Sequence, residues 1–425
     1  MSGGGTAVSV GAGRRQWNRV WGSYSISAAG TAVATGIFPI IAIVELNASP
    51  ADVTAMAAVS AVAGGVIATW GSRVFGRFPV VRVLRLVETA QFLMMASLLV
   101  AAALGGLTFV HLVAVATSQT VGHIVYAAGF SLHMKLVLRD EEFIDANSRV
   151  EATNWSTQTI GPIVGGALVS ALGVFVSVAV DAVSFLAAAL GLARVNGPAP
   201  VEAPGPNGPS PSSRGGGLRH IWRTPTLRAL YLNAMTLGGG LLMSSPLLAL
   251  LMLRELHLPP WQYGLSLGLP AAAGLAGALS AQAINRRLGG DRALLIFGAL
   301  RGPCLLPLVF VPTAPYPALA VVLVSQCALL FAAGVFNPGF ATTRLRVCPT
   351  DLITRVTAAW SASAKVVQPA CIAAGGLLAA RWGLRSALMA AAALGLLSTV
   401  MLPWSLLRAP RAERREEPAP AAPGT

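Results

Sequence analysis

The sequence predicts an all-α integral membrane protein with twelve transmembrane helices, arranged as two pseudo-symmetric six-helix bundles. Three observations predict this class. Only 11% of the 425 residues are charged, whereas a soluble globular domain carries about 25%. Hydrophobic residues make up 55% of the chain, and its mean hydropathy is +0.68. Apolar stretches close to the roughly 20 residues that cross a bilayer follow one another along the whole chain.

That length criterion divides the chain into twelve expected spans. They cover residues 23–46, 51–71, 84–105, 108–133, 150–172, 174–194, 229–253, 264–285, 292–312, 317–342, 356–380 and 384–407. The divisions are shortest at "ALGV" after the fifth span and at "RWGLR" after the eleventh span, where only a few residues separate two helices.

Basic residues orient these spans, because cytoplasmic loops carry an excess of Lys and Arg. With the N-terminus inside, 25 of the 30 basic residues fall in cytoplasmic segments, and the outer segments hold only Arg254, Arg381 and Arg385. We therefore expect both termini in the cytoplasm. The net charge of +14 then reflects topology and not nucleic-acid binding. The excess of Arg (28) over Lys (2) suggests a GC-rich bacterium, and so a bacterial inner membrane.

The chain is expected to divide into five parts. They are a cytoplasmic tail (1–22), a six-helix bundle (23–194), a cytoplasmic linker (195–228), a second six-helix bundle (229–407) and a disordered cytoplasmic tail (408–425). The linker segment "NGPAPVEAPGPNGPSPSSRGGG" is rich in Pro, Gly and Ser, which predicts a flexible connection. The basic amphipathic stretch "LRHIWRTPTLRAL" predicts a helix on the membrane surface.

Two short repeats relate the halves. "AGGVIATWGSRVFG" (63–76) aligns without gaps on "AGALSAQAINRRLG" (276–289), a step of 213 residues from 63 to 276. "WSTQTIGPIVGG" (155–166) resembles "WSASAKVVQPACIAAGG" (360–376) once gaps are allowed, which places Lys365 in the position of Gln158. Such internal repeats are typical of membrane proteins built from two related halves.

Two six-helix halves, a basic loop after the second and eighth spans, and a long central loop together resemble the major facilitator superfamily. "GPIVGGALVSALGVFVSVAVDAVSFLAAAL" (161–190), "LRHIWRTPTLRAL" (218–230), "FNPGF" (336–340) and "PTDLITRVTA" (349–358) are similar to its branch of bacterial exporters that includes the enterobactin exporter and drug-efflux proteins. The resemblance implies proton-coupled antiport that exports a drug, siderophore or secondary metabolite by alternating access.

The chain departs from this family in two places. The acidic position of the loop signature is Ser72 in the first half and Asn285 in the second, so the role of that acid as a charge partner in a cytoplasmic gate is open. The Arg that efflux families carry in the fourth span is absent, and His123 lies nearby. The candidate gate residues are Ser72, Arg73, Arg77, Glu88, Glu151, Asn285, Arg286 and Arg287.

A Gly-Pro pair and a Gly-Gly pair mark the fifth span. They are Gly161, Pro162, Gly165 and Gly166, and their spacing resembles the antiporter signature of that helix. Proline removes one backbone hydrogen bond and bends the helix, while glycines let a neighbouring helix approach closely. We interpret the stretch as a hinge of the export type, with a generic membrane-helix kink as the alternative.

Ionisable residues inside spans are candidates for substrate or proton binding, because each is costly to bury unless it is paired or hydrated. Asp181 is a candidate proton site, or a structural carboxylate bonded to a neighbour such as Ser184. Lys365 is expected to hold an anionic substrate or to pair with a carboxylate. His123, near Tyr126, is a candidate for proton or substrate binding, with a structural hydrogen bond as the alternative.

Other charged and polar residues complete the candidate set. Glu88 lies near Arg85, so an interfacial ion pair is the expected arrangement, and Glu151 lies beside Arg149 as a gate or interfacial residue. Arg301 is expected to pair with a carboxylate or to extend to the membrane surface. The remaining polar residues either line a cavity or bond helix to helix, and they are Asn154, Gln158, Asn233, Gln326 and Asn337.

The chain carries no motif for nucleotide or metal-dependent catalysis, such as G-x-x-x-x-G-K-[ST], H-E-x-x-H or G-x-S-x-G. We therefore expect no enzyme, no cofactor and no metal site, with the proton gradient as the energy source. The four cysteines are widely spaced and indicate neither disulfides nor a metal site. We expect a monomer in the bilayer that binds a small molecule and no nucleic acid. The alternatives are metabolite uptake, facilitated diffusion, or a non-transporting scaffold or sensor.

Overall fold

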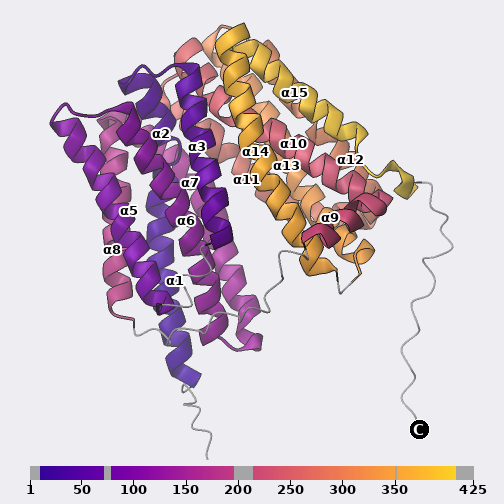
Figure 1. Cartoon of the computed structure of the whole chain (residues 1–425). Coiled ribbons are helices and arrows are strands. Elements are labelled where there is room, and N and C mark those ends of the chain that lie inside the picture. The colour runs from indigo at the N-terminus through magenta and orange to yellow at the C-terminus, as the bar shows by residue number, and fades with distance from the viewer. Residues whose placement is uncertain (1–9, 71–77, 196–213, 350–351, 408–425) are drawn as a thin grey trace, which may run out of the picture.

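The structure is a computed structural model that describes residues 10–70, 78–195, 214–349 and 352–407. Within those ranges all regular elements are helices, and Figure 1 shows them as two bundles side by side. The first bundle contains α1 (Val10–Val33), α2 (Ile37–Ile40), η1 (Ile41–Glu45), α3 (Pro50–Trp70), α5 (Val80–Ala103), α6 (Phe109–Val137), α7 (Phe143–Leu172) and α8 (Val174–Ala193).

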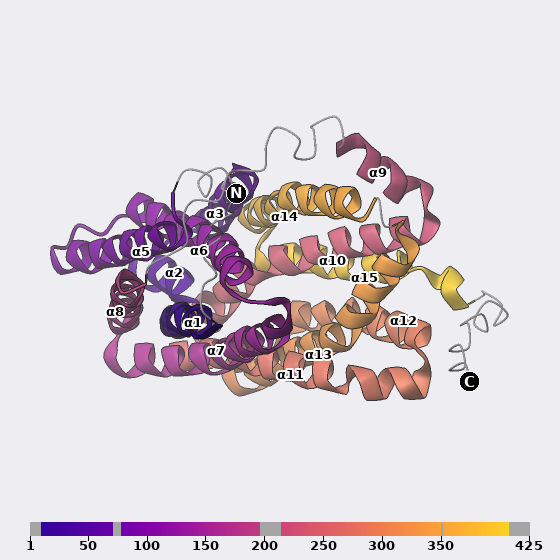
Figure 2. The ribbon, with the colours of Figure 1, turned by 90° about the horizontal axis from the view of Figure 1, so that it is seen from below.

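The second bundle follows a short helix, α9 (Arg214–Arg223), which packs on it. It contains α10 (Pro225–Leu250), η4 (Leu251–Glu255), α11 (Pro260–Leu288), α12 (Gly290–Arg301), η5 (Pro303–Phe310), α13 (Pro315–Val347), α14 (Ile353–Trp382), α15 (Leu384–Val400) and η6 (Trp404–Leu407). Two helices of this bundle pack against the first bundle, α14 against α3 and α11 against α7 (Figure 2).

The described helices agree with the twelve expected spans. Eleven of the described helical segments are long and apolar enough to cross a membrane. The other long segment is α7, whose N-terminal half and centre carry charged and polar side chains such as Glu151, Asn154 and Gln158. The main difference is at the start, because α1 begins at Val10 and continues without a break into the first span. The predicted tail at residues 1–22 is therefore helical from residue 10.

The two bundles repeat each other's backbone. Asn47 and His257 are the two non-glycine residues with positive φ in the described ranges, at 49° and 50°. Gly173 and Gly383 end the equivalent helices α7 and α14 with φ of 89° and 85°. Both pairs are separated by 210 residues, from 47 to 257 and from 173 to 383. The repeat that the sequence indicates is thus present in the backbone.

This register corrects one sequence alignment. A step of 210 residues aligns Gly165 and Gly166 with Gly375 and Gly376 without a gap, and it places Lys365 opposite Trp155 and not opposite Gln158. The sequence alignment matched tryptophans and prolines and needed gaps, whereas both helices run unbroken between equivalent ends. The 213-residue step includes residues 71–77, which lie outside the described residues, and stays a prediction.

The bundles join at one end and separate at the other. We call the end where α8 ends and α10 begins the linker end, and the opposite end the far end. One hydrophobic cluster at the far end contains buried residues of both bundles, including Ile41, Val178, Leu250 and Leu388. At the linker end the clusters are separate, one in the first bundle around Trp17 and two in the second. In Figure 1 the bundles accordingly diverge toward the linker end.

Hydrogen bonds reinforce the closed far end. Arg254 donates from Nη1 to the carbonyl oxygen of Ala48 at 2.9 Å, and the backbone N–H of Trp261 donates to Ser170 Oγ at 2.9 Å. At the linker end, in contrast, the ion pairs of the described residues stay within one bundle, as Arg14 with Asp145 at 3.9 Å illustrates. The molecule is therefore closed at the far end and open at the linker end.

Candidate functional site

Asp181 is buried in the first bundle, where α8 packs against α1. Its side chain is 3% exposed, and its Oδ1 accepts a hydrogen bond from Thr31 Oγ1 at 3.1 Å. Ser184 Oγ donates to the backbone carbonyl of Asp181 at 2.8 Å and lies 3.5 Å from Oδ1. Gly30 makes this packing possible, because a Cβ there would overlap the Ser184 side chain. The predicted contact with Ser184 is present, and Thr31 adds a second partner.

Glu88 is buried beside the same face of α1. It is 1% exposed, and its Oε2 accepts a hydrogen bond from Ser27 Oγ at 3.1 Å. Ser27 and Thr31 are four residues apart and therefore lie one above the other on the helix. The expected ion pair with Arg85 is absent among the described residues, and Arg85 is exposed. The structure thus places Glu88 inside the bundle, next to Asp181, and not at a gate loop.

We call Glu88 and Asp181 the acid pair, since both accept hydrogen bonds from the same face of α1. Three ion pairs occur in the described part of the chain, all at partly exposed side chains, and none includes either member of the acid pair. A charge in the membrane interior is costly without a partner, and such groups are typical of proton and ion pathways. The acid pair is therefore the main candidate for ion coupling.

An aromatic group lies beside the acid pair, toward the linker end. Tyr24 of α1 donates its hydroxyl to Asn154 Oδ1 of α7 and stacks on Tyr126 of α6, with ring centroids 6.2 Å apart. Phe130 packs against both rings. The Tyr126 hydroxyl is buried without a hydrogen-bond partner among the described atoms. Asn154 and Tyr126, two of the predicted residues, are thus brought together through Tyr24, which the sequence analysis did not select.

His123 differs from Tyr126, three residues further along α6, in its exposure. It is exposed, whereas Tyr126 is 5% exposed and faces the bundle interior. Another histidine of α6, His133, is fully buried, and both of its ring nitrogens lack a partner in the described structure. The sequence analysis missed His133 because a single histidine in an apolar helix gives no sign of which side is buried.

The second bundle holds an interior cation. Arg301 is 7% exposed, and its Nη2 donates to Asn233 Oδ1 at 3.0 Å. Asn233 Nδ2 in turn donates to the Ser398 carbonyl oxygen at 2.7 Å. The guanidinium lies 3.5 Å from the centroid of the Phe336 ring, a cation–π contact. Arg301 is therefore held by an amide and a ring, and within the described residues it forms no ion pair with the carboxylate that the sequence suggested.

Of the polar alternatives, Asn233 bonds helix to helix, whereas other residues are accessible. Gln158 on α7 and Asn337 on α13 are exposed. Gln326 is half-buried, and its Oε1 lacks a partner in the described structure. Lys365 lies where α14 meets α3. A Cβ added to Gly65 of α3 would be 3.5 Å from Lys365 Cβ, which shows how close the two helices are. These positions suit residues that contact a molecule between the bundles.

The glycine stretch of α7 packs against α1 of its own bundle and against α11 of the other bundle. Added Cβ atoms on Gly161 and Gly165 would overlap the backbone of Ala32 and Val33 in α1. Gly166 faces α11, where a Cβ would lie 3.0 Å from Gly264 Cα. The same contact recurs 210 residues later, where a Cβ on Gly376 would overlap the Thr54 side chain. Pro162 is buried, and α7 continues through it as one helix.

The predicted gate residues are only partly described. Ser72, Arg73 and Arg77 lie outside the described residues. Asn285, Arg286 and Arg287 lie in the last turn of α11 at the linker end, where both arginines are exposed. Glu151 is exposed on α7. Its neighbour Arg149 pairs with Asp145 at 3.1 Å. These positions are consistent with a linker-end location, and their gate role stays a prediction.

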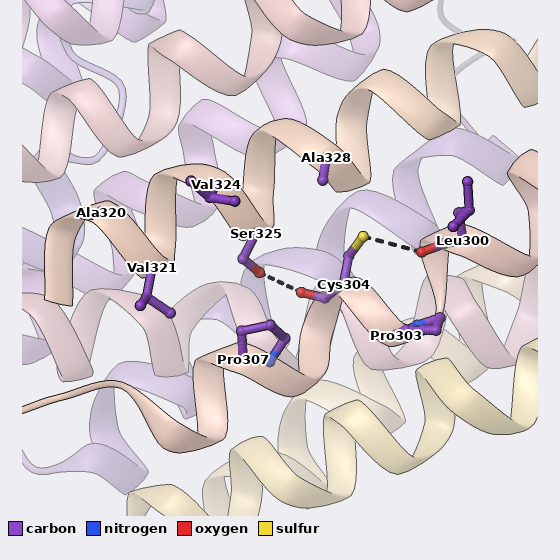
Figure 3. A pocket seen from close by; sticks show the side chains of 9 residues that line it. All are labelled: Leu300, Pro303, Cys304, Pro307, Ala320, Val321, Val324, Ser325 and Ala328. Carbon is purple, nitrogen blue, oxygen red and sulfur yellow. Dashed lines mark hydrogen bonds between the residues drawn. The ribbon is translucent and has the colours of Figure 1, made fainter. Parts of the chain in front are cut away.

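A separate cavity of about 490 Å³ lies between α12, η5 and α13 (Figure 3). Its lining is apolar, and its polar atoms are internally bonded, with Ser325 donating to the Cys304 carbonyl and Cys304 Sγ 3.1 Å from the Leu300 carbonyl. It contains none of the predicted site residues. Within the described ranges no three His, Cys, Asp or Glu side chains gather as a metal ion requires.

Known proteins share this architecture. The sequence profile described as Major Facilitator Superfamily matches residues 20–367 and, in a second match, residues 243–424. A bacterial homologue of the iron transporter ferroportin in an inward-facing state superimposes with a TM-score of 0.72 at 19% identity, over 91% of this chain and 98% of that chain. The same homologue in an outward-facing state gives 0.57, at the same identity and coverage.

The nucleoside transporter NupG superimposes with a TM-score of 0.67 at 12% identity, over 91% of this chain and 97% of that chain. No curated protein matches the sequence. At these identities the solved structures establish the fold.

Proposed function

We propose that this chain, which belongs to the Major Facilitator Superfamily and is a membrane transporter of that type, exports a small organic molecule by alternating access in exchange for protons. The observation that carries the proposal is Asp181, a carboxylate 3% exposed within a membrane-spanning helix and paired with no cation among the described ion pairs. A group of this kind serves in a transporter as a site where a proton binds and leaves.

The direction of transport rests on resemblance and packing together. Gly161, Pro162, Gly165 and Gly166 have the spacing of the antiporter signature, and three of them lie where α7 meets α1 and α11 near the closed far end. A transporter closed at the far end and open at the linker end can take its cargo from the linker side. The basic residues favour the cytoplasm on that side, so we propose a bacterial inner membrane with both termini inside.

The substrate class also rests on resemblance. Segments of α7, α8 and α13 are similar to the exporter branch, which supports a drug, siderophore or secondary metabolite as the cargo. The accessible polar side chains Gln158 and Asn337 supply hydrogen-bonding groups for an organic molecule. The chain is proposed to work as a monomer, with the two bundles rocking around a site between them.

Transport by the full-length protein in sealed proteoliposomes tests the proposal. A panel of fluorescent organic compounds is followed with an imposed pH gradient and without it. We expect substrate to move against the proton flow, and we expect Asp181→Asn to reduce this movement to the rate without a gradient. Asp52→Asn is the matched control, because Asp52 is half-buried at the far end of the first bundle and only caps α3 through Ser49.

Each other outcome selects another function. Movement of substrate in the same direction as protons would indicate uptake, and equilibration independent of pH would indicate facilitated diffusion. A correctly inserted protein that transports no member of the panel would favour a scaffold or sensor. If Asp181→Asn keeps full gradient-driven transport, Asp181 is not the coupling site.

A further inference from the structure

Helix α1 connects the acid pair with the contact between the bundles. On one face, Ser27 donates to Glu88 and Thr31 donates to Asp181, each at 3.1 Å and one helical turn apart. Gly30 lies between these two residues, and a Cβ there would be 3.4 Å from Asp181 Cα. The two hydroxyls are thus the polar link between α1 and the carboxylates of α5 and α8.

The next residues of α1 contact α7. Ala32 and Val33 lie so close to Gly161 and Gly165 that no side chain fits between the two backbones. Because only hydrogen atoms separate the backbones, a shift of α1 along its axis must move α7 or open this contact. On the adjacent face, Gly166 of α7 packs against α11 of the second bundle. Helices α8, α1, α7 and α11 therefore contact one another in series.

The end of α1 also touches the second bundle directly. The helix stops at Val33, and Gly36 takes a left-handed conformation with φ of 86°. A Cβ on Gly36 would lie 2.8 Å from Tyr263 Cε1 and 3.1 Å from Leu267 Cδ1 of α11. Gly36, in contact with the other bundle, therefore follows Thr31, whose hydroxyl binds Asp181, by only five positions. A change at Thr31 has a short path to the bundle interface.

Few other titratable groups face the acid pair. Tyr126 of α6 interacts electrostatically with Glu88; the residue is 5% exposed, and its buried hydroxyl has no partner in the described structure. Tyr24 of α1 interacts with Tyr126 and, through space, with Glu151 of α7. Within the acid pair, the charge of Asp181 acts on Glu88.

We propose that Glu88 and Asp181 act as one proton-sensing pair, and that Ser27 and Thr31 transmit its charge state through α1 to the contact of α7 with α11. This inference rests on the proposed proton coupling. A charged carboxylate accepts a hydroxyl hydrogen bond about twice as strong as a neutral acceptor does. When one proton binds to the pair, the carboxylic acid donates that proton to a neighbouring oxygen, and its hold on the hydroxyl of α1 weakens. Helix α1 can then shift against α7.

Thr31 and Ser27 are positioning residues, so their variants are tested by a conformational readout in addition to transport. The full-length protein is first freed of its four native cysteines, and Glu141 and Leu345 are then each replaced by cysteine. Spin labels on these two cysteines report the distance between the bundles at the linker end. Both positions are exposed, one in each bundle. The distance distribution is measured in lipid nanodiscs without substrate, in acidic and in alkaline buffer.

In the labelled protein with an unsubstituted α1, we expect the equilibrium between linker-end-open and linker-end-closed states to differ between the two buffers. Thr31→Val and Ser27→Ala should each reduce the pH-dependent change in that equilibrium constant by about tenfold, since each loses one hydrogen bond to a charged acceptor. Ser25→Ala, on the same helix, and Thr35→Val, in the turn that follows it, are matched controls, because their hydroxyls donate to backbone carbonyls of α1. These controls should keep the full pH response. Thr31→Ser should also keep it, because serine retains the hydroxyl that donates to Asp181.

The outcomes separate this inference from the proposed function. A pH response of the bundle distance that is equal in Thr31→Val and Thr35→Val overturns the role of α1, even if transport is proton-coupled. The absence of any pH response in the unsubstituted helix also overturns it. If the pH response follows the prediction while no gradient-driven transport occurs, the proposed function fails and the role of α1 stands. Thr31→Ser distinguishes loss of the hydrogen bond from a folding defect, because it changes the same side chain but keeps the hydroxyl.

Discussion

Single buried residues in this chain are held by partners from distant parts of the sequence. Asn233 is the clearest case, because it is fully buried and joins α10 to both Arg301 and the Ser398 carbonyl. In the sequence it is one of several polar residues in apolar helices, with cavity and helix contacts as equal alternatives. The structure decides for helix contacts, since the amide is fully engaged. The same reasoning applies to Glu88, whose partner Ser27 lies 61 residues away.

Asn233→Ala should destabilise the second bundle. It removes the acceptor of a buried guanidinium group, and leaving such a donor unsatisfied costs about 1–3 kcal/mol or more. We expect a lower free energy of unfolding, measured as the loss of folded protein with temperature or denaturant in detergent. Asn337→Ala, at an exposed position, is the control and should change stability by less than about 0.5 kcal/mol. Equal effects of the two substitutions would contradict the role assigned to Asn233.

At the scale of the helix, glycines determine which elements can meet. The far half of α7 presents glycine to α1 on one side and to α11 on another, whereas Ala167 on the same helix is exposed. Lipid and protein interior are similarly apolar, so the close approach depends on small residues and not on a hydrophobic face. The hinge interpretation of Pro162 stays a prediction, since α7 continues through it without interruption.

Gly165→Val should disrupt transport without preventing membrane insertion. Its side chain would overlap the Val33 carbonyl and force α1 and α7 apart, and such overpacking typically costs about 1–3 kcal/mol. We expect at least a roughly tenfold lower transport rate at an equal amount of protein in the membrane. Ala167→Val adds similar bulk on the exposed side of the same helix and should transport normally. Normal transport by both variants would show that this contact is not needed for the transport cycle.

At the scale of the whole molecule, the two halves are equivalent in backbone but differ in chemistry. Gly166 with Gly264 and Gly376 with Thr54 are the same contact repeated 210 residues apart. The first bundle, in contrast, contains two buried carboxylates, and the second contains a buried arginine. We infer that the symmetric contacts allow the rocking motion, whereas the first bundle responds to protons.

The orientation in the membrane can be tested by labelling. Cysteines that replace Leu104, at the far end, and Glu141, at the linker end, are introduced separately into protein without its native cysteines; both positions are exposed. Because basic residues collect at the linker end, a membrane-impermeant maleimide should label position 104 in intact cells, and position 141 only after permeabilisation. The reverse pattern would show that the termini lie outside.

The sequence by itself determined the number of spans, their limits to within a few residues for most helices, the two-fold repeat and the family. These features depend on local hydropathy, on length and on residues close together in the chain. It also selected Asp181 and the glycines of α7, which the structure places at helix contacts, and their functional roles remain predictions.

Only the tertiary structure decided which polar groups meet. Ser27 and Thr31 are ordinary small polar residues in the sequence, and Glu88 looked like an interfacial residue beside Arg85. In a membrane helix the buried and lipid-facing sides are both apolar, so the pattern does not mark the side that faces a neighbour. The acid pair, the register of the repeat and the closed far end follow from the packing of helices that are far apart in the chain.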